Sequence, residues 1–188
     1  MVEERAQRRL AAILAADVVG YSRLMQLDEA GTLAVLKARR SQVLQPVVSR
    51  HRGRIVKLMG DGVLVEFASA VDAVECAVQL QKAMTAANAD TPEDQHIVLR
   101  VGINLGDVMV EGSDLYGDGV NIAARLEALA EPGGICISST VRDHIGERLP
   151  YLFEDIGEQI DSQEHCSTGP SLFHERRCGG VLTSNLNG

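Results

Sequence analysis

Apolar residues along the first 110 positions follow two patterns, one with the period of a strand and one with that of a helix. Four short apolar runs, each bounded by glycine or polar residues, predict strands at residues 10–19, 54–59, 63–67 and 97–110. Between these runs, apolar side chains recur every three or four positions and predict helices at residues 28–52 and 69–88. The predicted order of elements is therefore β-α-β-β-α-β.

The residues that follow add shorter elements and then lose all periodicity. The pattern predicts a helix at 119–130, a short strand at 135–137, a short helix at 138–145 and an edge strand at 152–156. This order favours an α+β domain with a ferredoxin-like mixed sheet covered by helices on one face. Residues 157–188 are rich in Ser, Gly, Gln and Asn, so we expect one domain at 1–156 and a poorly ordered tail at 157–188.

Local signals refine these elements. The Gly-Asp-Gly sequence at 60–62, between two apolar runs, predicts a hairpin turn. Pro46 lacks an N–H and predicts a kink or a division in the helix at 28–52. Ser69 resembles the first residue of a capping box and predicts a helix start. The polar residues at 104–107 predict a loosening of the strand at 97–110.

Two carboxylates lie where carboxylates are unusual. Asp17 ends the first apolar strand, and Asp61 lies at the tip of the hairpin. The first strand can pair with this hairpin, which would bring both side chains to one end of the sheet. Two carboxylates there repel each other unless a cation lies between them, and Mg²⁺ is typically bound by one or two carboxylates plus substrate phosphates. Ordinary turn chemistry is the alternative for Asp61.

Three further polar residues are candidates for nucleotide binding. Lys57 lies within an apolar strand, where the alternative is an edge lysine that discourages aggregation. Four positions separate it from Asp61, about 13 Å in an extended chain, so the two could reach opposite ends of one nucleotide or belong to different sites. Asn121 and Arg125 share one helix face at i and i+4 and suit a phosphate charge and an ether oxygen, with a solvated helix face as the alternative.

Composition narrows the class of partner. With 26 acidic and 18 basic residues the formal net charge is −8, and only 3% of residues are aromatic, which argues against nucleic acid. A phosphate ligand is compatible with this charge because carboxylates can hold a metal that holds the phosphate. No apolar run reaches the length of about 20 residues that a spanning helix needs, so we expect a cytoplasmic protein without membrane insertion. Cys76 and Cys136 lie in apolar patterns and are expected to be buried, reduced thiols.

Four motifs in a fixed order carry a family resemblance. The motifs are AADVVGYS at 15–22, GRIVKLMGDG at 53–62, LRVGINLG at 99–106 and DLYGDGVNIAAR at 114–125. Over about residues 8–156 the sequence resembles the catalytic domain of class III nucleotide cyclases, specifically of bacterial adenylate cyclases. The resemblance implies conversion of ATP to 3′,5′-cyclic AMP and pyrophosphate.

The resemblance also implies a role for each candidate residue. These roles are metal binding for Asp17 and Asp61, adenine selection for Lys57 and Asp114, and transition-state stabilisation for Asn121 and Arg125. It implies two Mg²⁺ ions, for which Mn²⁺ can substitute. It further implies a head-to-tail homodimer, in which metal residues of one subunit meet base-selecting and transition-state residues of the other. Lys57 and Asp61 of one chain would then serve different active sites.

The resemblance weakens after residue 157. Family members continue with a basic segment and a final strand, whereas no lysine follows Lys82 here, and we expect the last strand to be absent. One alternative is therefore a catalytically weak cyclase-like domain that binds nucleotide or dimerises as a regulator. An RNA-recognition domain also fits the element order, but the scarcity of aromatic residues and the acidic charge argue against it.

Overall fold

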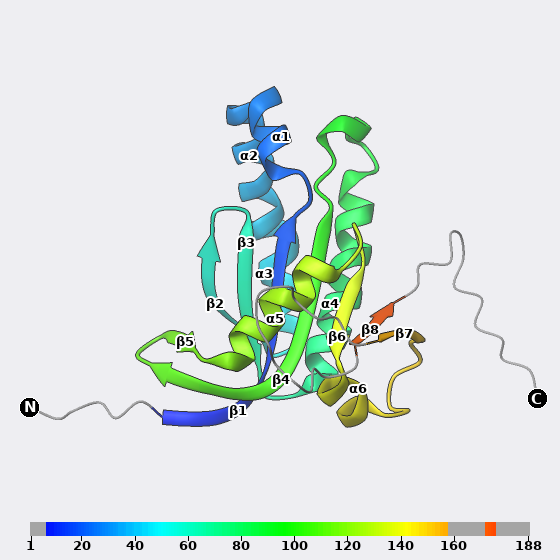
Figure 1. Ribbon diagram of the computed structural model, residues 1–188. Helices are drawn as coiled ribbons and strands as arrows, with labels where there is room; N and C mark the ends of the chain where they lie inside the picture. The colour runs from blue at the N-terminus through cyan, green and yellow to red at the C-terminus, as the bar shows by residue number, and fades with distance from the viewer. Residues whose placement is uncertain (1–6, 158–171, 176–188) are drawn as a thin grey trace, which may run out of the picture.

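The computed structural model describes residues 7–157 and 172–175, which form one sheet with helices on its two faces (Figure 1). The strands are β1 (Gln7–Val18), β2 (Arg54–Met59), β3 (Gly62–Phe67), β4 (Leu99–Glu111), β5 (Asp114–Tyr116), β6 (Ile135–Ser138), β7 (Phe153–Gly157) and β8 (Leu172–Glu175). The helices are α1 (Tyr21–Leu27), α2 (Glu29–Arg39), α3 (Gln45–Arg50), α4 (Ala70–Asn88), α5 (Asp118–Leu129) and α6 (Ser139–Ile145). A π-helical turn, η1 (Arg40–Leu44), joins α2 to α3, and a 3₁₀ turn, η2 (Glu93–Gln95), precedes β4.

The sheet has β1 near its centre. Its strands pair in the order β2-β3-β1-β4-β6-β8-β7, and β5 pairs with β4 beside this path. β1 is antiparallel to both β3 and β4, whereas β4 and β6 are parallel. The mixed sheet and its helices confirm the predicted α+β architecture. The expectation of helices on one face is wrong, because α5 packs on the face opposite α3 and α4.

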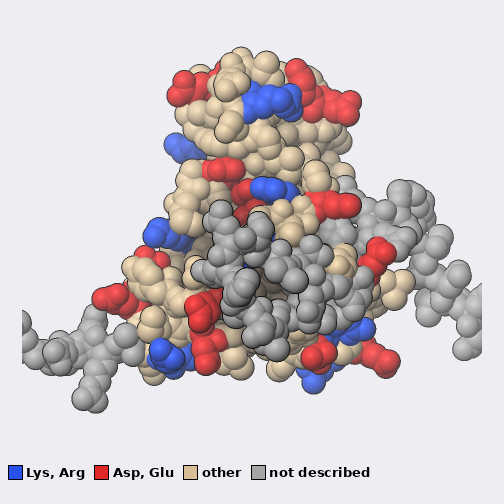
Figure 2. Space-filling view, viewed as in Figure 1, with Lys and Arg blue, Asp and Glu red and all other residues tan. Residues whose placement is uncertain are grey.

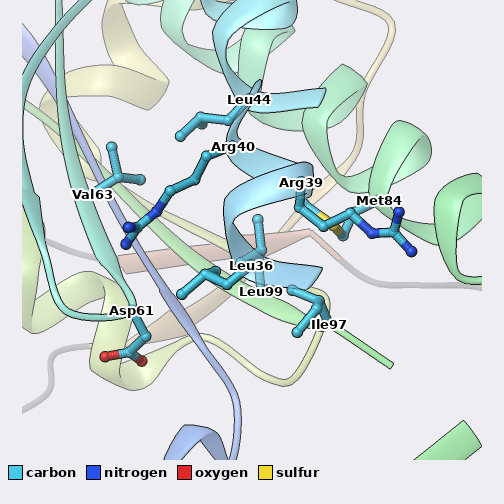
Figure 3. Close-up of a pocket in the computed structure, with 9 residues that line it drawn as sticks. All are labelled: Leu36, Arg39, Arg40, Leu44, Asp61, Val63, Met84, Ile97 and Leu99. Carbon is cyan, nitrogen blue, oxygen red and sulfur yellow. The ribbon is translucent and has the colours of Figure 1, made fainter. Parts of the chain in front are cut away.

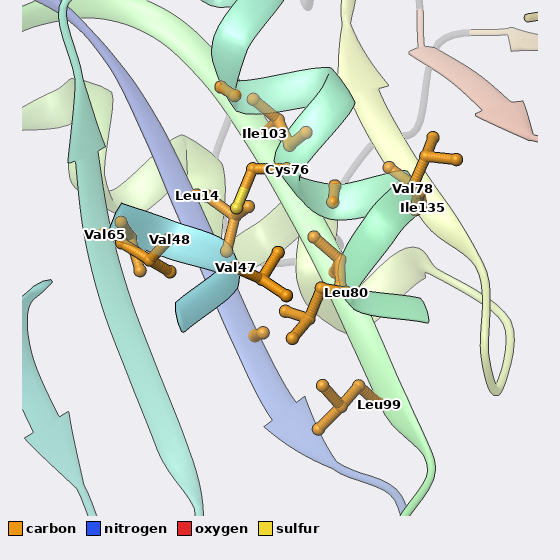
Figure 4. Packing of buried hydrophobic residues seen from close by; sticks show 14 of the residues in the cluster. Leu14, Val47, Val48, Val65, Cys76, Val78, Leu80, Leu99, Ile103 and Ile135 are labelled. Carbon is orange, nitrogen blue, oxygen red and sulfur yellow. The ribbon is translucent and has the colours of Figure 1, made fainter. Parts of the chain in front are cut away.

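Alternate side chains of β1 are buried on opposite faces of the sheet. On one face Leu14 belongs to a core with Val48 of α3 and Leu80 of α4 (Figure 4). On the other face Ile13 belongs to a second core with Ala123 of α5. Because β1 is buried on both sides, its sequence is a continuous apolar run rather than an alternation.

The predicted helix at 28–52 is divided, as Pro46 indicated. Pro46 lies in the first turn of α3, where its missing N–H needs no partner. The π turn η1 immediately precedes α3, and its wider backbone accommodates a ring that would clash with the preceding turn of a continuous α-helix. Helix α1 was not predicted, because Leu24 is its one buried residue and no apolar period exists there.

The predicted hairpin turn at 60–62 and the predicted helix start at Ser69 are confirmed, whereas the predicted loosening of the strand at 104–107 is wrong. β2 and β3 pair on either side of the turn that holds Asp61. The Ser69 hydroxyl accepts a hydrogen bond from the Asp72 N–H at 3.4 Å and caps α4. β4 pairs with β1 without interruption through Asn104, whose buried amide donates to the Gly119 carbonyl at 3.2 Å. The amide is thus satisfied without breaking the strand.

The expectation that the final strand is absent is wrong. β8 pairs antiparallel with both β6 and β7, so that it lies between them in the sheet. β7 is the edge strand, as predicted. The rest of the predicted tail, residues 158–171 and 176–188, lies outside the described residues, and the domain limits 1–156 and 157–188 stay a prediction.

Cys76 in α4 and Cys136 in β6 are buried, free thiols, as predicted. Burial raises the pKa of each thiol to about 12, so neither is a reactive thiolate near neutral pH. Within the described ranges, no helix combines the length and the apolar character that crossing a membrane requires.

Candidate active site

The two candidate metal aspartates lie at the same end of the sheet, as predicted. Asp17 is the penultimate residue of β1, and Asp61 lies in the turn between β2 and β3. The N–H of Val18, next to Asp17 in the chain, donates to Oδ2 of Asp61 at 3.2 Å. This hydrogen bond holds the tip of the hairpin against the end of β1.

Sequence reasoning missed two residues that surround Asp17. Arg100 lies directly opposite Asp17 on β4 and donates from Nε to Oδ1 at 3.1 Å and from Nη2 to Oδ2 at 2.7 Å. Its Nη2 also lies 3.4 Å from Oε1 of Glu127 in α5. Arg100 therefore joins carboxylates from two different elements. The register of β1 on β4 is the signal that would have identified Arg100, because cross-strand neighbours share one face.

The surroundings of Glu127 and Arg100 shift the pKa values of these two side chains. Burial raises the pKa of Glu127 to about 7, and a hydrogen bond with Asp17 and the charge of Asp17 add to this effect. The hydrogen bond with Asp17 raises the pKa of the Arg100 guanidinium, which therefore stays charged. The guanidinium of Arg100 thus lies between Asp17 and Glu127, and the charge of Asp61 adds to the rise of its pKa.

The donor set at this end of the sheet fits a hard divalent cation. Mg²⁺ prefers carboxylate oxygens and is usually bound by one or two carboxylates together with substrate phosphates. Across the described part of the chain, no cluster of three or more His, Cys, Asp or Glu residues could hold a metal by itself. Asp17 and Asp61 therefore fit a cation that shares its ligands with a phosphate group.

The candidate base-selecting residues also meet. The Nζ of Lys57 in β2 lies 3.4 Å from Oδ2 of Asp114 in β5. The Tyr116 hydroxyl donates to the same Oδ2 at 3.1 Å, and the Leu115 N–H donates to Oδ1 at 3.0 Å. The Leu115 hydrogen bond is the main cause of a lowered Asp114 pKa, so the carboxylate is charged and fixed in place near neutral pH.

A β-bulge in β2 aims Lys57 at Asp114. Ile55 packs on the core beneath α3 and α4, and strict alternation would place Lys57 on that same face. The pairing with β3 shifts between Ile55 and Lys57, so that Lys57 lies opposite Leu64, which belongs to the core on the other face. The extra residue therefore turns the lysine over to the face where β5 lies.

Asn121 and Arg125 lie together on the exposed side of α5, as their spacing predicted. The start of this helix packs closely on β4, because a Cβ at Gly119 would lie 2.9 Å from the Asp107 carbonyl oxygen. The structure thus forms three groups of candidates: Asp17 with Asp61, Lys57 with Asp114, and Asn121 with Arg125. Lys57 and Asp61 belong to different groups although four positions separate them.

The sequence of this chain matches a known family over most of its length. The model of the adenylate and guanylate cyclase catalytic domain matches residues 4–160. The chain belongs to this family. A Rhizobium meliloti (strain 1021) protein provisionally named adenylate cyclase 3 is 62% identical over 157 residues, which cover 84% of this chain and 27% of that protein. An adenylate cyclase of Streptomyces coelicolor (strain ATCC BAA-471 / A3(2) / M145) is 34% identical over 143 residues, which cover 76% of this chain and 36% of the relative.

A solved structure agrees with the assignment. The crystal structure of an adenylate/guanylate cyclase/hydrolase from Silicibacter pomeroyi superposes with a TM-score of 0.83 at 42% identity, covering 90% of this chain and 98% of that chain. The cyclase domain described here spans only 27% and 36% of the lengths of the two curated relatives above.

The surface of the cyclase domain carries mixed charge. On the face shown in Figure 2, Lys and Arg side chains are scattered among Asp and Glu. Much of the positive charge that clusters at residues 37–57 of the sequence is paired within the fold. Arg52 lies 2.7 Å from Asp72, and Arg54 lies 2.8 Å from Glu66. These pairs neutralise charge that a phosphate backbone would otherwise contact.

A small pocket at the end of the sheet that carries the two candidate aspartates is lined by Arg40 and Asp61 among others (Figure 3). Arg40 comes from the π turn η1 and donates from Nη2 to the carbonyl oxygen of Gly60, the residue before Asp61. The π turn thus supplies a second support for the hairpin, in addition to the Val18 hydrogen bond.

We expect Arg40→Met to loosen the hairpin tip. The substitution removes a charge-assisted hydrogen bond worth about 1.5 kcal/mol, which corresponds to roughly tenfold faster local opening. Hydrogen–deuterium exchange of a peptide spanning residues 58–66 measures this rate. Arg50→Met, at an exposed position of α3, is the matched control and should leave the exchange unchanged. Equal exchange in the wild type and Arg40→Met would show that Arg40 does not support the turn.

Proposed function

We propose that this domain is an adenylate cyclase, which converts ATP to 3′,5′-cyclic AMP and pyrophosphate in cyclic-nucleotide signalling. The observation that carries the proposal is the Lys57–Asp114 pair, held 3.4 Å apart on the same sheet as the two-aspartate site. In the reaction the ribose 3′-oxygen attacks the α-phosphorus, the bond to the pyrophosphate oxygen breaks, and the 3′-hydroxyl proton leaves. The names of the relatives from Rhizobium meliloti and Streptomyces coelicolor support the choice of nucleotide.

Asp17 and Asp61 would hold the divalent ions of the site, two Mg²⁺ or Mn²⁺. When bound, these ions supply a lowered pKa for the 3′-hydroxyl and neutralisation of the phosphate charge. The protein contributes the position of both carboxylates: Arg100 fixes Asp17, and the Val18 N–H fixes Asp61.

Lys57 and Asp114 would select adenine over guanine. The lysine can donate to adenine N1, which carries no proton, whereas guanine N1 is protonated. The Asp114 carboxylate can accept from the adenine amino group, where guanine presents a carbonyl oxygen. The pair therefore attracts ATP and rejects GTP through opposite demands at two adjacent atoms.

Two sites completed across a head-to-tail homodimer fit the arrangement of the candidates. Large apolar side chains near the Lys57–Asp114 pair and at the end of α5 are exposed: Leu58 44%, Met59 51%, Tyr116 46% and Leu129 40%. Such a surface is suited to cover by a second copy of the chain. Arg125 of one subunit would then stabilise the charge that builds up at the α-phosphoryl group held by the other subunit, and Asn121 would orient the ribose.

The test is an assay of the purified chain with ATP or GTP, each with Mg²⁺ or Mn²⁺, followed by separation of the products. We expect cyclic AMP and pyrophosphate in equal amounts and at least tenfold less cyclic GMP. Nucleotide binding without a cyclic product would overturn the proposal and favour a regulatory cyclase-like domain. A larger yield of cyclic GMP would overturn the assignment of the base.

We expect Asp114→Asn to weaken the preference for ATP. An amide can present either an acceptor oxygen or a donor nitrogen, so that it tolerates the guanine carbonyl and loses the charge that attracts the adenine amino group. The kcat/KM for ATP should fall about tenfold, and the ATP-to-GTP ratio should fall with it, as one charged hydrogen bond predicts. Asp118→Asn, at an exposed position in the first turn of α5, is the control. An unchanged ratio in Asp114→Asn would remove this residue from base selection.

A further inference from the structure

Helix α5 presents polar side chains on two opposite sides. Asn121 and Arg125 lie within about 40° of each other around the helix axis, whereas Glu127 lies about 160° from Arg125, at 100° per residue. Asn121 and Arg125 are exposed, and the Glu127 side chain is only 15% exposed. The two sides of the helix therefore face different surroundings.

The side with Glu127 lies over the metal end of its own subunit. Arg100 bridges the two carboxylates, with Nη2 at 2.7 Å from Asp17 and 3.4 Å from Glu127. The side chains of this group come from β1, β4 and α5, and none of them is more than 31% exposed. The bridge is thus a shielded contact between three elements.

Close backbone packing near Gly102 fixes the distance between α5 and β4. A Cβ at Gly102, two residues after Arg100, would lie 2.1 Å from the Glu127 nitrogen and 2.4 Å from the Ala123 carbonyl oxygen. The backbone of α5 therefore rests directly on β4, and the Cα of Glu127 cannot move away from Arg100 without moving the helix.

We propose that Glu127 is a positioning residue for the metal-binding carboxylate Asp17, acting with Arg100. The inference rests on the proposed function, because it assigns Glu127 to a metal half-site. Asn121 and Arg125 serve the active site completed with the other subunit's metal residues, whereas Glu127, two residues further along, serves the metal half-site of its own chain. One helix therefore contributes to both active sites of the dimer.

Heterodimers test this assignment. Two variants are co-expressed with different affinity tags and purified in tandem, so that each dimer contains one copy of each variant. Glu127→Ala with Asn121→Ala leaves one site fully wild type and should give about half of the wild-type activity, because a symmetric dimer has two equivalent sites. Glu127→Ala with Asp17→Ala damages the metal half of both sites and should stay no more active than a Glu127→Ala homodimer.

The opposite pattern would overturn the inference, since recovery with Asp17→Ala would place Glu127 in the transition-state half. Asp17→Ala with Asn121→Ala is the control and should also give about half of the wild-type activity. If the wild type is active and this control is not, the shared-site model fails, and the measurement of cation binding below decides the role of Glu127.

Binding of Mn²⁺ to the protein without nucleotide gives a readout independent of activity. Glu127→Asp keeps the charge but shortens the reach, and should weaken Mn²⁺ affinity about tenfold, as loss of an outer partner of a metal ligand does. Glu127→Gln keeps the length and both hydrogen-bonding atoms, and should stay within about threefold of the wild type. Glu29→Ala, at an exposed position in α2, controls for loss of one charge.

Electron paramagnetic resonance of free Mn²⁺ measures the affinity of each variant, with thermal unfolding recorded alongside. Weakening in Glu127→Asp together with rescue in Glu127→Gln supports positioning of Asp17. Equal affinity in all variants would overturn the inference, and so would equal weakening in the Asp and Gln variants, which a merely structural role predicts. Weakening in Glu127→Gln alone, which a charge effect predicts, would also overturn it.

Discussion

Asp61→Asn is expected to reduce cation-dependent cyclisation at least about 100-fold, because the change removes a charged ligand of the divalent ions. The substituted amide can still accept the hydrogen bond that the Val18 N–H donates to Oδ2 at 3.2 Å. The hairpin should therefore keep its position, and the variant should lose chemistry rather than structure. Product formation from ATP with Mg²⁺ and with Mn²⁺ measures the loss.

Two controls separate this effect from misfolding. Sedimentation of Asp61→Asn should show the same oligomeric state as the wild type, and Mn²⁺ affinity should fall together with activity. Asp90→Asn, at an exposed position beyond the end of α4, removes the same charge elsewhere and should stay fully active. Turnover of Asp61→Asn at the wild-type rate would exclude Asp61 from the metal site.

Gly102→Ala is expected to produce the largest loss of stability among the substitutions considered. The added Cβ would lie 2.1 Å from the Glu127 nitrogen and 2.7 Å from the Leu126 carbonyl carbon, and both atoms belong to the backbone of α5. Since backbone cannot rotate away, the helix must lift from β4. Overpacking of this kind costs about 3 kcal/mol, and a domain of this size would then unfold about 10 °C lower.

Thermal unfolding of the purified variant checks this value, and cyclase activity should be lost well below the new midpoint because α5 carries Asn121 and Arg125. Gly20→Ala is the matched control. Within 4 Å a Cβ at Gly20 meets only Arg23 Nε, at 3.8 Å, and the left-handed backbone there (φ +66°, ψ +27°) costs alanine about 1 kcal/mol. Equal stability of the two variants would contradict the close seating of α5 on β4.

The spacing of apolar residues and the positions of glycine and proline were sufficient to predict most of the fold. The run at 10–19 gave the central strand because both of its faces are buried, and Pro46 correctly marked the division between α2 and α3. These signals are local, so they do not predict a strand whose position depends on its pairing partners. β8 is a short strand whose place depends on β6 and β7, and nothing within residues 172–175 alone shows a strand period.

The candidate site likewise contains residues that local sequence signals identify and residues that they do not. The sequence motifs named Asp17, Asp61, Lys57 and Asp114, and the structure brings them together as two pairs of neighbours. Arg100 and Glu127 were missed because their importance depends on what lies opposite them. An arginine in a strand and a glutamate in a helix are ordinary residues until the register of β4 and the seating of α5 place them beside Asp17.

The bulge in β2 makes the direction of Lys57 depend on how the hairpin pairs as well as on residue type. In a regular strand of the same sequence, Lys57 would lie on the face of Ile55, away from Asp114, although every motif residue would still be present. Deleting Val56, the extra residue of the bulge, would by contrast leave Lys57 on its present face, opposite Leu64. Comparison of cyclase sequences for nucleotide preference therefore needs the register of the two strands of this hairpin as well as the identity of the lysine.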